Sequence, residues 1–435
     1  MPDIYEIVNA TQLNNDLEDV ADAIRAKSQG QDPLLFPSEF ISEIGSIPTG
    51  ASITGQTDVS AKAMENIAQG DTVLVFKKGD KILYDCFATR AYSCAFSPDG
   101  TRLAFASEYS PYLLVYDTTT MPYTRLQSPS TLPAGAATGV SWSPNGNYLA
   151  VSHDTSPFIT IYDTTTTPYT KIANPGTLPG GKGNGCAFSP DGTMLAVAHS
   201  SGDYITVYNT STWAKRAAPS NKPAGTGQGC AWSPDSSHLA VAHTNSPRIT
   251  IYSITSTTMN KLTNPSDLPT GNAYGCAYNH AGTRLTVCHA TSPFITIYDT
   301  STTPYTKIAD PGTLPGTTCW SCTWNADDTE LFVGRNYSNS GLAIYDTSST
   351  PYQIESPAWI SNYGVGRCFS LNPTGTRLAG AGNYAPFEYV YSMEDTTIMW
   401  KASNSLSGPI LCSYGYAKSS IASGSTGDAA ILFEP

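Results

Sequence analysis

The chain has 435 residues, a net charge of −12 and 13% charged residues, where about 25% is usual for a soluble domain. Its lysines and arginines never cluster beyond a pair, which argues against nucleic-acid binding through phosphate neutralisation. Its apolar runs stay well short of the ~18 residues that a membrane helix needs. The acidic N-terminus also lacks the pattern of a signal peptide, so we expect a protein made and folded in a cytoplasm, without membrane insertion.

Residues 1–48 differ from the rest of the chain and predict a small helical module. Apolar residues recur at helical spacing from Leu13 to Ile24, Thr11 is suited to cap this helix, and a second short helix is predicted over 37–44. Two helices of this length bury little apolar surface on their own. We therefore expect this module to oligomerise or to dock on another protein.

A polar, glycine-bearing linker is predicted over residues 49–79. Within it, the apolar stretch at 71–78 predicts a strand, and residues 81–84 predict another just beyond it. The linker thus separates the helical module from the repeats that follow.

The remainder of the chain repeats one pattern eight times. An aromatic residue is followed by a turn such as Ser-Pro-Asp-Gly, then by an aliphatic residue seven positions on, and then by a strand ending in Tyr-Asp. Successive copies begin 43 to 47 residues apart, and a four-stranded propeller blade needs about 40–50 residues. The pattern predicts an all-β propeller over residues 80–435. The copies begin at Phe96, Trp142, Phe188, Trp232, Tyr278, Trp324, Leu371 and Tyr414.

The number of blades follows from the number of copies. Eight copies predict eight blades, with seven as the alternative if the degenerate last copy folds differently. That copy ends after its third strand, so we expect residues 80–86 to supply its fourth strand and to close the ring. Closure removes an open sheet edge that would favour aggregation.

Residues that recur in nearly every copy are interpreted as framework. Cysteine stands two positions before the aromatic in six copies, on the same strand face, and is expected to pack between blades. The histidines four positions after the second-strand leucine are expected to form a repeated hydrogen bond that holds the loop between the second and third strands or the crossing between blades. A metal site is not expected, because equivalent positions in neighbouring blades are too far apart to share an ion. The tyrosines of the third strand are expected to be buried. The histidines are His153, His199, His243 and His289, and Ser107 takes their place in the first blade.

Positions where the repeat varies are the candidates for binding. One set is the loop between the second and third strands, and the other is the crossing from one blade to the next. Exposed aromatic residues there would bind a glycan or a protein, and the alternative is that they cover the loops beneath them. The loop residues are Tyr112, Phe158, Tyr204, Arg248, Phe294, Leu342 and Phe387, and the crossing residues are Asn184, Tyr274, Trp320 and Tyr363.

The sequence offers no linear catalytic motif. It contains no Gly-x-Ser-x-Gly elbow, no phosphate-binding loop and no HExxH pair. The aspartates of the Ser-Pro-Asp-Gly turns, Asp99, Asp191 and Asp235, are expected to bond their own turns. We therefore expect a protein that is not an enzyme and that needs neither cofactor nor metal.

The repeats resemble the WD-repeat family from about residue 80 to the C-terminus. The resemblance rests on the Ser-Pro-Asp-Gly turn, the Leu-Ala strand and the ending of the third strand, as in Tyr162-Asp163. Tyrosine replaces that family's tryptophan, and its Gly-His pair is absent, so its network of bracing hydrogen bonds is not carried over. The resemblance implies a propeller and says little about function.

The N-terminal region carries a second resemblance. The stretches 20–27 (VADAIRAK) and 36–44 (FPSEFISEI) resemble a short module at the start of phage and prophage tail structural proteins, and 63–73 (AMENIAQGDTV) is similar to linker strands in that group. This implies a homo-oligomeric virion protein, attached to other tail proteins through residues 1–48, whose propeller binds a host surface glycan or protein. The alternatives are a cytoplasmic WD-repeat scaffold for protein assembly and a propeller hydrolase with a metal in its channel.

Overall fold

A computed structural model describes most of the repeat region and four short strands outside it. Side chains are described for residues 90–119, 123–219, 221–336, 341–354, 366–382 and 388–393. The two predicted N-terminal helices, the strand predicted at 81–84, the closing strand predicted at 80–86 and the eighth copy around Tyr414 lie outside the described residues. Within the part of the chain that is described, no helix is long and apolar enough to span a membrane.

The chain divides into two compact units. The first holds residues 1–85, 118–124 and 391–435 and contains a four-stranded sheet. In this sheet β2 and β30 run parallel, and the other neighbouring strands run antiparallel. Strand β3 lies within the stretch predicted as a strand at 71–78. The four strands are β1 (Ser52–Thr54), β2 (Ser60–Ala63), β3 (Val73–Phe76) and β30 (Thr397–Lys401).

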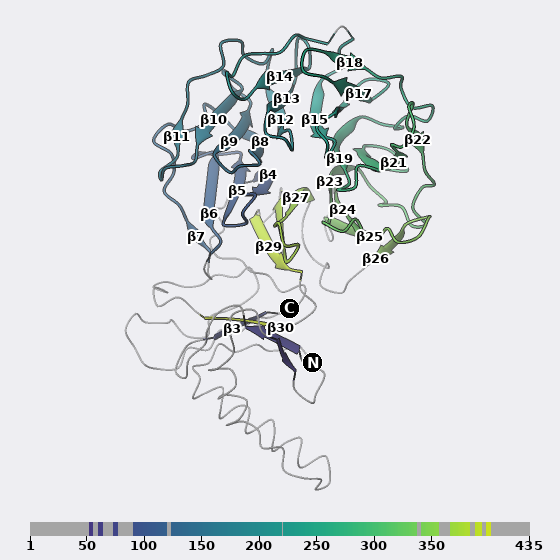
Figure 1. Ribbon diagram of the computed structural model, residues 1–435. Coiled ribbons are helices and arrows are strands. Elements are labelled where there is room, and N and C mark those ends of the chain that lie inside the picture. Colours follow the sequence, from purple (N-terminus) through teal and green to yellow (C-terminus); the bar gives the residue numbers. More distant parts are fainter. Residues whose placement is uncertain are drawn as a thin grey trace, which may run out of the picture. The chain divides into compact units, whose positions relative to one another are not determined.

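The second unit is a β-propeller of seven antiparallel sheets around a central axis (Figure 1). The innermost strands are β4 (Ala91–Phe96), β8 (Ala137–Trp142), β12 (Gly183–Phe188), β15 (Gly227–Trp232), β19 (Ala273–Tyr278), β23 (Cys319–Trp324) and β27 (Gly366–Leu371). The second strands are β5 (Arg102–Ser107), β9 (Tyr148–His153), β13 (Met194–His199), β16 (His238–His243), β20 (Arg284–His289), β24 (Glu330–Arg335) and β28 (Arg377–Gly382). The third strands are β6 (Leu113–Asp117), β10 (Ile159–Asp163), β14 (Ile205–Asn209), β17 (Ile249–Ile254), β21 (Ile295–Asp299), β25 (Leu342–Asp346) and β29 (Glu388–Ser392). Five sheets have a described fourth strand: β7 (Thr124–Arg125), β11 (Thr170–Lys171), β18 (Met259–Lys261), β22 (Thr306–Lys307) and β26 (Gln353–Glu355).

The ring closes with seven blades. The seventh blade packs directly against the first, where the backbone amide of Phe96 donates to the Ser370 hydroxyl at 3.3 Å. An equivalent hydrogen bond joins the second and third blades, where the backbone amide of Phe188 donates to the Ser141 hydroxyl at 3.1 Å. An eighth blade would have to separate Phe96 from Ser370. The count of eight is therefore wrong, and the alternative of seven blades is confirmed.

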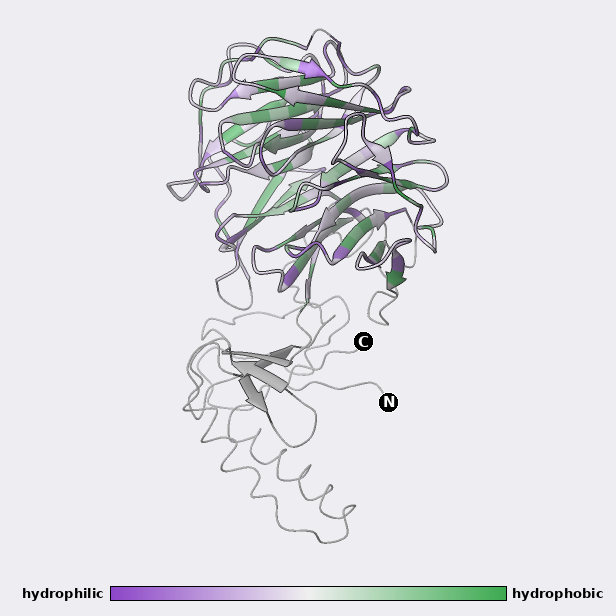
Figure 2. Cartoon of the chain, turned by 45° about the vertical axis from the view of Figure 1, so that its right-hand side comes forward, coloured by the Kyte–Doolittle hydropathy of each residue, from purple (hydrophilic) through white to green (hydrophobic). Residues whose placement is uncertain are grey.

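The apolar core lies between neighbouring sheets. One cluster joins Leu113 and Val115 of the first blade to Trp142 and Leu149 of the second. The indole nitrogen of Trp142 also donates to the Ala95 carbonyl of the first blade at 3.1 Å. Figure 2 shows the apolar colour along the strands and the polar colour mainly on the turns. Because each blade buries its faces against its neighbours, the ring stabilises the inner strands that surround the axis.

Candidate binding site at the mouth of the central channel

The repeated histidines belong to the framework. Each imidazole Nε2 lies at hydrogen-bond distance from a threonine hydroxyl on the third strand of its own blade, seven residues later. The expected framework bond is thus present, although its partner lies on a strand rather than in a loop. The pairs are His153 with Thr160 (3.0 Å), His199 with Thr206 (2.9 Å), His243 with Thr250 (2.9 Å) and His289 with Thr296 (3.0 Å).

The third-strand tyrosines are buried, as expected, and they hold the crossings between blades. In four blades the phenol donates to a backbone carbonyl 31 residues earlier, on the crossing that leads into the innermost strand of the same blade. These tyrosines therefore position the chain just before it enters the channel wall. The pairs are Tyr162 with Thr131 (2.9 Å), Tyr208 with Thr177 (2.8 Å), Tyr252 with Asn221 (2.8 Å) and Tyr298 with Asp267 (2.7 Å).

The repeated cysteines lie between blades, as the pattern predicts. The Cys186 thiol, for example, lies 3.6 Å from the Ala150 carbonyl of the preceding blade. Burial raises the pKa of Cys186 to about 12, so this thiol is protonated at neutral pH. Cys319 and Cys322, which form a CxxC pair in the sequence, are both free thiols. Among the described residues, no three His, Cys, Asp or Glu side chains are grouped closely enough to hold a metal ion.

Each innermost strand carries a β-bulge at its entry to the channel. In β12, for example, Gly183 pairs with His199 and Gly185 pairs with Ala198, so Asn184 is the extra residue. The same irregularity occurs in all seven sheets, and every extra residue lines one central cavity. Bulges re-aim side chains and are frequent beside functional sites. We name these seven the bulge ring: Tyr92, Thr138, Asn184, Gln228, Tyr274, Trp320 and Arg367.

Four consecutive members of the bulge ring form an aromatic and cationic arc. The rings of Tyr274 and Trp320 lie 4.3 Å apart between centroids. The Arg367 guanidinium lies 3.8 Å from the Trp320 ring centroid on one side and 5.8 Å from that of Tyr92 on the other. The two aromatic side chains hold the guanidinium in place through cation–π contact.

The other three members form a neutral polar arc. The Thr138 hydroxyl donates to the Gly183 carbonyl at 2.6 Å, and the Asn184 amide donates to the Gly227 carbonyl at 2.7 Å, so each braces the next blade. The Gln228 side chain lines the cavity beside them. These three side chains offer uncharged amide and hydroxyl groups, and the exposed Lys182, two residues before Asn184, also lines the cavity.

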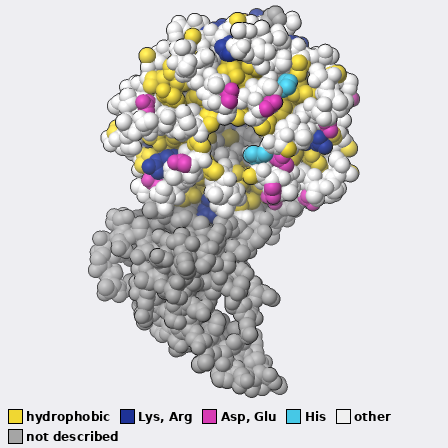
Figure 3. Space-filling model, viewed as in Figure 1, with side chains coloured by type: hydrophobic (Ala, Val, Ile, Leu, Met, Phe, Trp, Pro, Cys, Tyr) yellow, Lys and Arg dark blue, Asp and Glu magenta, His cyan; other side chains and the backbone are white. Residues whose placement is uncertain are grey.

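The bulge ring surrounds a cavity of about 460 Å³ at the centre of the propeller. Figure 3 shows the ring hollowed at this centre. The volume falls in the range of about 300–1,000 Å³ that is typical of small-molecule sites. Its polar and aromatic groups converge from all seven blades, which is the arrangement expected of a binding site.

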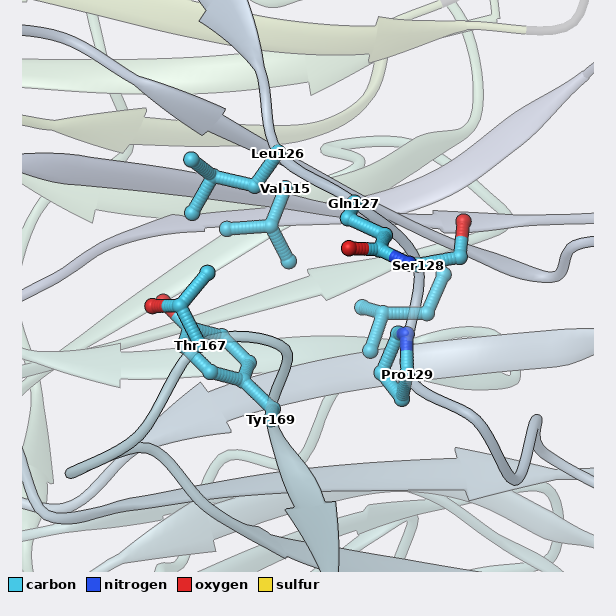
Figure 4. Close-up of a pocket in the computed structure, with 8 residues that line it drawn as sticks. Val115, Leu126, Gln127, Ser128, Pro129, Thr167 and Tyr169 are labelled. Carbon is cyan, nitrogen blue, oxygen red and sulfur yellow. The ribbon is translucent and has the colours of Figure 1, made fainter.

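Two other hollows are smaller. One of about 280 Å³ opens beside Phe96, His280 and Trp324, at the opposite ends of the innermost strands. The other holds only about 10 Å³ between the first two blades, where Val115, Leu126 and Tyr169 line it (Figure 4). A space of that size accommodates about one water molecule.

The two sets of residues predicted to bind a ligand lie in different parts of the propeller. Tyr112 and Phe294 pack against the apolar clusters between blades, and the Arg248 guanidinium donates to the Pro269 carbonyl at 3.0 Å. Phe158 and Tyr204 are partly buried, Leu342 is buried, and Phe387 and Tyr363 lie outside the described residues. None of the described loop residues lines the central cavity, whereas Asn184, Tyr274 and Trp320 do.

Sequence reasoning overlooked Tyr92, Thr138, Gln228 and Arg367 as site residues. A signal for them is present in the repeat, because the position two before the repeated cysteine reads Tyr, Thr, Asn, Gln, Tyr, Trp and Arg from the first blade to the seventh. The positions on either side of it carry only small residues, Ala, Gly, Ser or Cys, in all seven blades. Variation at one column of a repeated strand marks the channel-facing bulge.

Close backbone packing around the bulges constrains several glycines, and Gly275 is one of them. A Cβ atom on Gly275 would lie 2.5 Å from the Trp320 carbonyl oxygen, whereas one on Gly185, the equivalent position two blades earlier, would lie 3.2 Å from its nearest atom. We expect Gly275→Ala to lower the free energy of unfolding by about 1–3 kcal/mol and Gly185→Ala to have a smaller effect. Urea denaturation of both variants measures this, and equal losses would contradict the proposed backbone contact.

Comparison with known proteins supports the fold. A family model described as eukaryotic translation initiation factor eIF2A matches residues 124–262. Among solved structures, hydrazine synthase of Kuenenia stuttgartiensis is similar with a TM-score of 0.57 and 15% sequence identity, over 71% of this chain and 97% of that one. No curated protein sequence matches the chain. The chain thus carries a WD-repeat-like β-propeller, a fold compatible with protein binding.

Proposed function

We propose that this chain is a non-enzymatic, tail-associated structural protein of a phage or prophage particle. Residues 1–48 attach it to other virion proteins and join its copies into an oligomer, and it assembles in the host cytoplasm. The propeller binds a glycan or a protein on the host surface. The similarity of residues 20–27 and 36–44 to tail-protein modules supports the attachment.

The bulge ring is the observation that carries the binding role. A propeller framework of repeated His, Tyr and Cys residues needs no particular side chain at the bulge position, because none of these framework contacts involves that position. Yet the bulges bring Tyr274, Trp320, Arg367 and Tyr92 together at one side of a cavity, each in contact with the next. Clustered aromatic and arginine side chains are typical of the energetic centres of binding sites.

Deletion of residues 1–60 tests the attachment. We expect the truncated chain to accumulate in the cell but to be absent from purified particles, because the proposed attachment module is gone. Immunoblots of lysate and of purified particles from the strain that encodes the chain measure this, with the full-length chain as the control. Incorporation of a folded, truncated propeller at the full-length level would overturn the anchoring role.

A cytoplasmic scaffold is the second candidate function. The match of residues 124–262 to the eIF2A family model favours it, because this match lies in the propeller and is independent of the N-terminal module. A scaffold predicts that the purified chain retains a defined soluble complex from the lysate and has no affinity for whole cells or cell-wall glycans. A virion protein predicts the reverse.

A further inference from the structure

Several hydrogen-bond donors at the aromatic side of the cavity have no partner. The indole Nε1 of Trp320, the hydroxyl of Ser321 and the Nε of Arg367 are all buried and make no hydrogen bond within the described part of the chain. All three residues line the cavity. Buried polar groups are nearly always paired in native proteins, so this group of donors indicates a missing acceptor.

The charge of the lining has the sign that such an acceptor requires. Arg367 and Lys182 are the charged residues among the described cavity lining, which contains no Asp or Glu, although the whole chain carries a net charge of −12. The nearby Glu108 lies 3.7 Å from Arg90 and so has its own cation. Arg367 is therefore a positioned guanidinium without a carboxylate partner among the described residues.

We propose that the bulge ring binds a saccharide that carries a carboxylate, such as a uronic or sialic acid unit of a surface glycan. This deepens the proposed function and rests on it for the source of the glycan. The carboxylate pairs with the Arg367 guanidinium. A small movement of the Trp320 and Ser321 side chains exposes their buried donors, the indole Nε1 and the hydroxyl, to the same carboxylate. The sugar hydroxyls face the neutral arc, where Asn184 and Gln228 supply amide donors and acceptors.

The neutral arc favours a sugar over an acidic peptide. An acidic peptide presents several carboxylates along its length and would be bound best by cations distributed around the channel. The described lining instead holds only two cations, Arg367 and Lys182, among the uncharged amide and hydroxyl groups of Thr138, Asn184 and Gln228. One carboxylate beside several hydroxyls is the pattern of an acidic sugar.

Calorimetric titration of the purified full-length protein tests the charge requirement. The probes are glucuronate, galacturonate and N-acetylneuraminate, each compared with its methyl ester, together with triglutamate as the peptide probe. We expect at least one acidic sugar to bind about 10- to 100-fold more tightly than its ester, as the loss of a charged hydrogen-bonded pair predicts. Equal binding of the ester, tighter binding of triglutamate or binding of no acidic sugar would overturn the proposal.

Substitution of Arg367 tests whether its guanidinium binds the carboxylate of the sugar. Arg367→Gln is expected to weaken binding of the preferred acidic sugar by about 10- to 100-fold, and Trp320→Phe, which removes only the Nε1 donor, by several-fold. The matched control is Arg284→Gln at the opposite end of a blade, which should bind like the wild type. Circular dichroism identifies any variant that fails to fold, and unchanged affinity in either folded site variant contradicts the proposal. Because titration needs no particle, its failure is distinguishable from failure of particle attachment.

Discussion

Acidification from pH 7 to 4.5 is expected to lower the free energy of unfolding by about 5 kcal/mol through two buried histidines alone. Burial lowers the pKa of His243 and His289 to about 4, from 6.5 in an unfolded chain. Between these two values the unfolded state binds more protons than the folded state, so stability falls as the pH falls. Each histidine contributes about 2–3 kcal/mol over this interval. Burial lowers the pKa of His153 and His199 as well, which acts in the same direction.

The aspartates of the turns change the free energy of unfolding only at lower pH values. Burial tends to raise the pKa of Asp191, but bonds from Ser189 and Thr193 outweigh it and lower that pKa below 3.8. A carboxylate with a lowered pKa loses its stabilising effect only as the pH falls from about its unfolded value towards its folded one. The histidines therefore dominate between pH 6.5 and 4.5.

Urea denaturation at several pH values measures this dependence. His289→Gln keeps a group that can bond Thr296 but cannot titrate, so the loss between pH 7 and 4.5 should shrink by about 2–3 kcal/mol. His280→Gln is the control, because its side chain is 57% exposed and surface substitutions rarely exceed about 0.5 kcal/mol. An unchanged pH dependence in His289→Gln would show that this histidine is not the source.

The repeat predicts the architecture because each blade obeys the same packing rules. Trp142 and its equivalents face the neighbouring blade, and the third-strand tyrosines are buried, so the framework residues could be recognised by their recurrence. The number of blades could not be counted in this way. Ring closure depends on whether Ser370 of the seventh copy packs against Phe96 or against an eighth blade, and this is decided by contacts between residues far apart in the sequence.

The candidate site was only partly predictable for a related reason. Tyr274 and Trp320 could be recognised as aromatic residues that break the repeat. Arg367 could not, because the sequence repeat is degenerate in its blade and the role of its guanidinium depends on side chains of the neighbouring blades. A β-bulge adds one residue to a strand without leaving a mark in its hydrophobic pattern. The contact of Arg367 with Trp320 joins adjacent blades at 3.8 Å and becomes visible only when the ring is assembled.

Truncation of a third-strand tyrosine is expected to destabilise the propeller strongly. Tyr298 is fully buried, and its hydroxyl donates to the Asp267 carbonyl at 2.7 Å, on the crossing that leads to Tyr274. We expect Tyr298→Ala to lower the free energy of unfolding by about 3–5 kcal/mol, because it removes a buried ring and leaves a cavity. Tyr298→Phe keeps the ring and loses one hydrogen bond, so it should cost about 1 kcal/mol.

Tyr345 provides a matched control in the sixth blade. It is equally buried, but its hydroxyl has no hydrogen-bond partner among the residues that the structure describes. A buried hydroxyl without a partner costs free energy, so Tyr345→Phe should leave stability unchanged or raise it slightly. Urea denaturation of Tyr298→Phe and Tyr345→Phe separates the two cases. If both variants lost the same stability, the hydroxyl bond to the crossing would not be what distinguishes these positions, and the tyrosines would act through their rings alone.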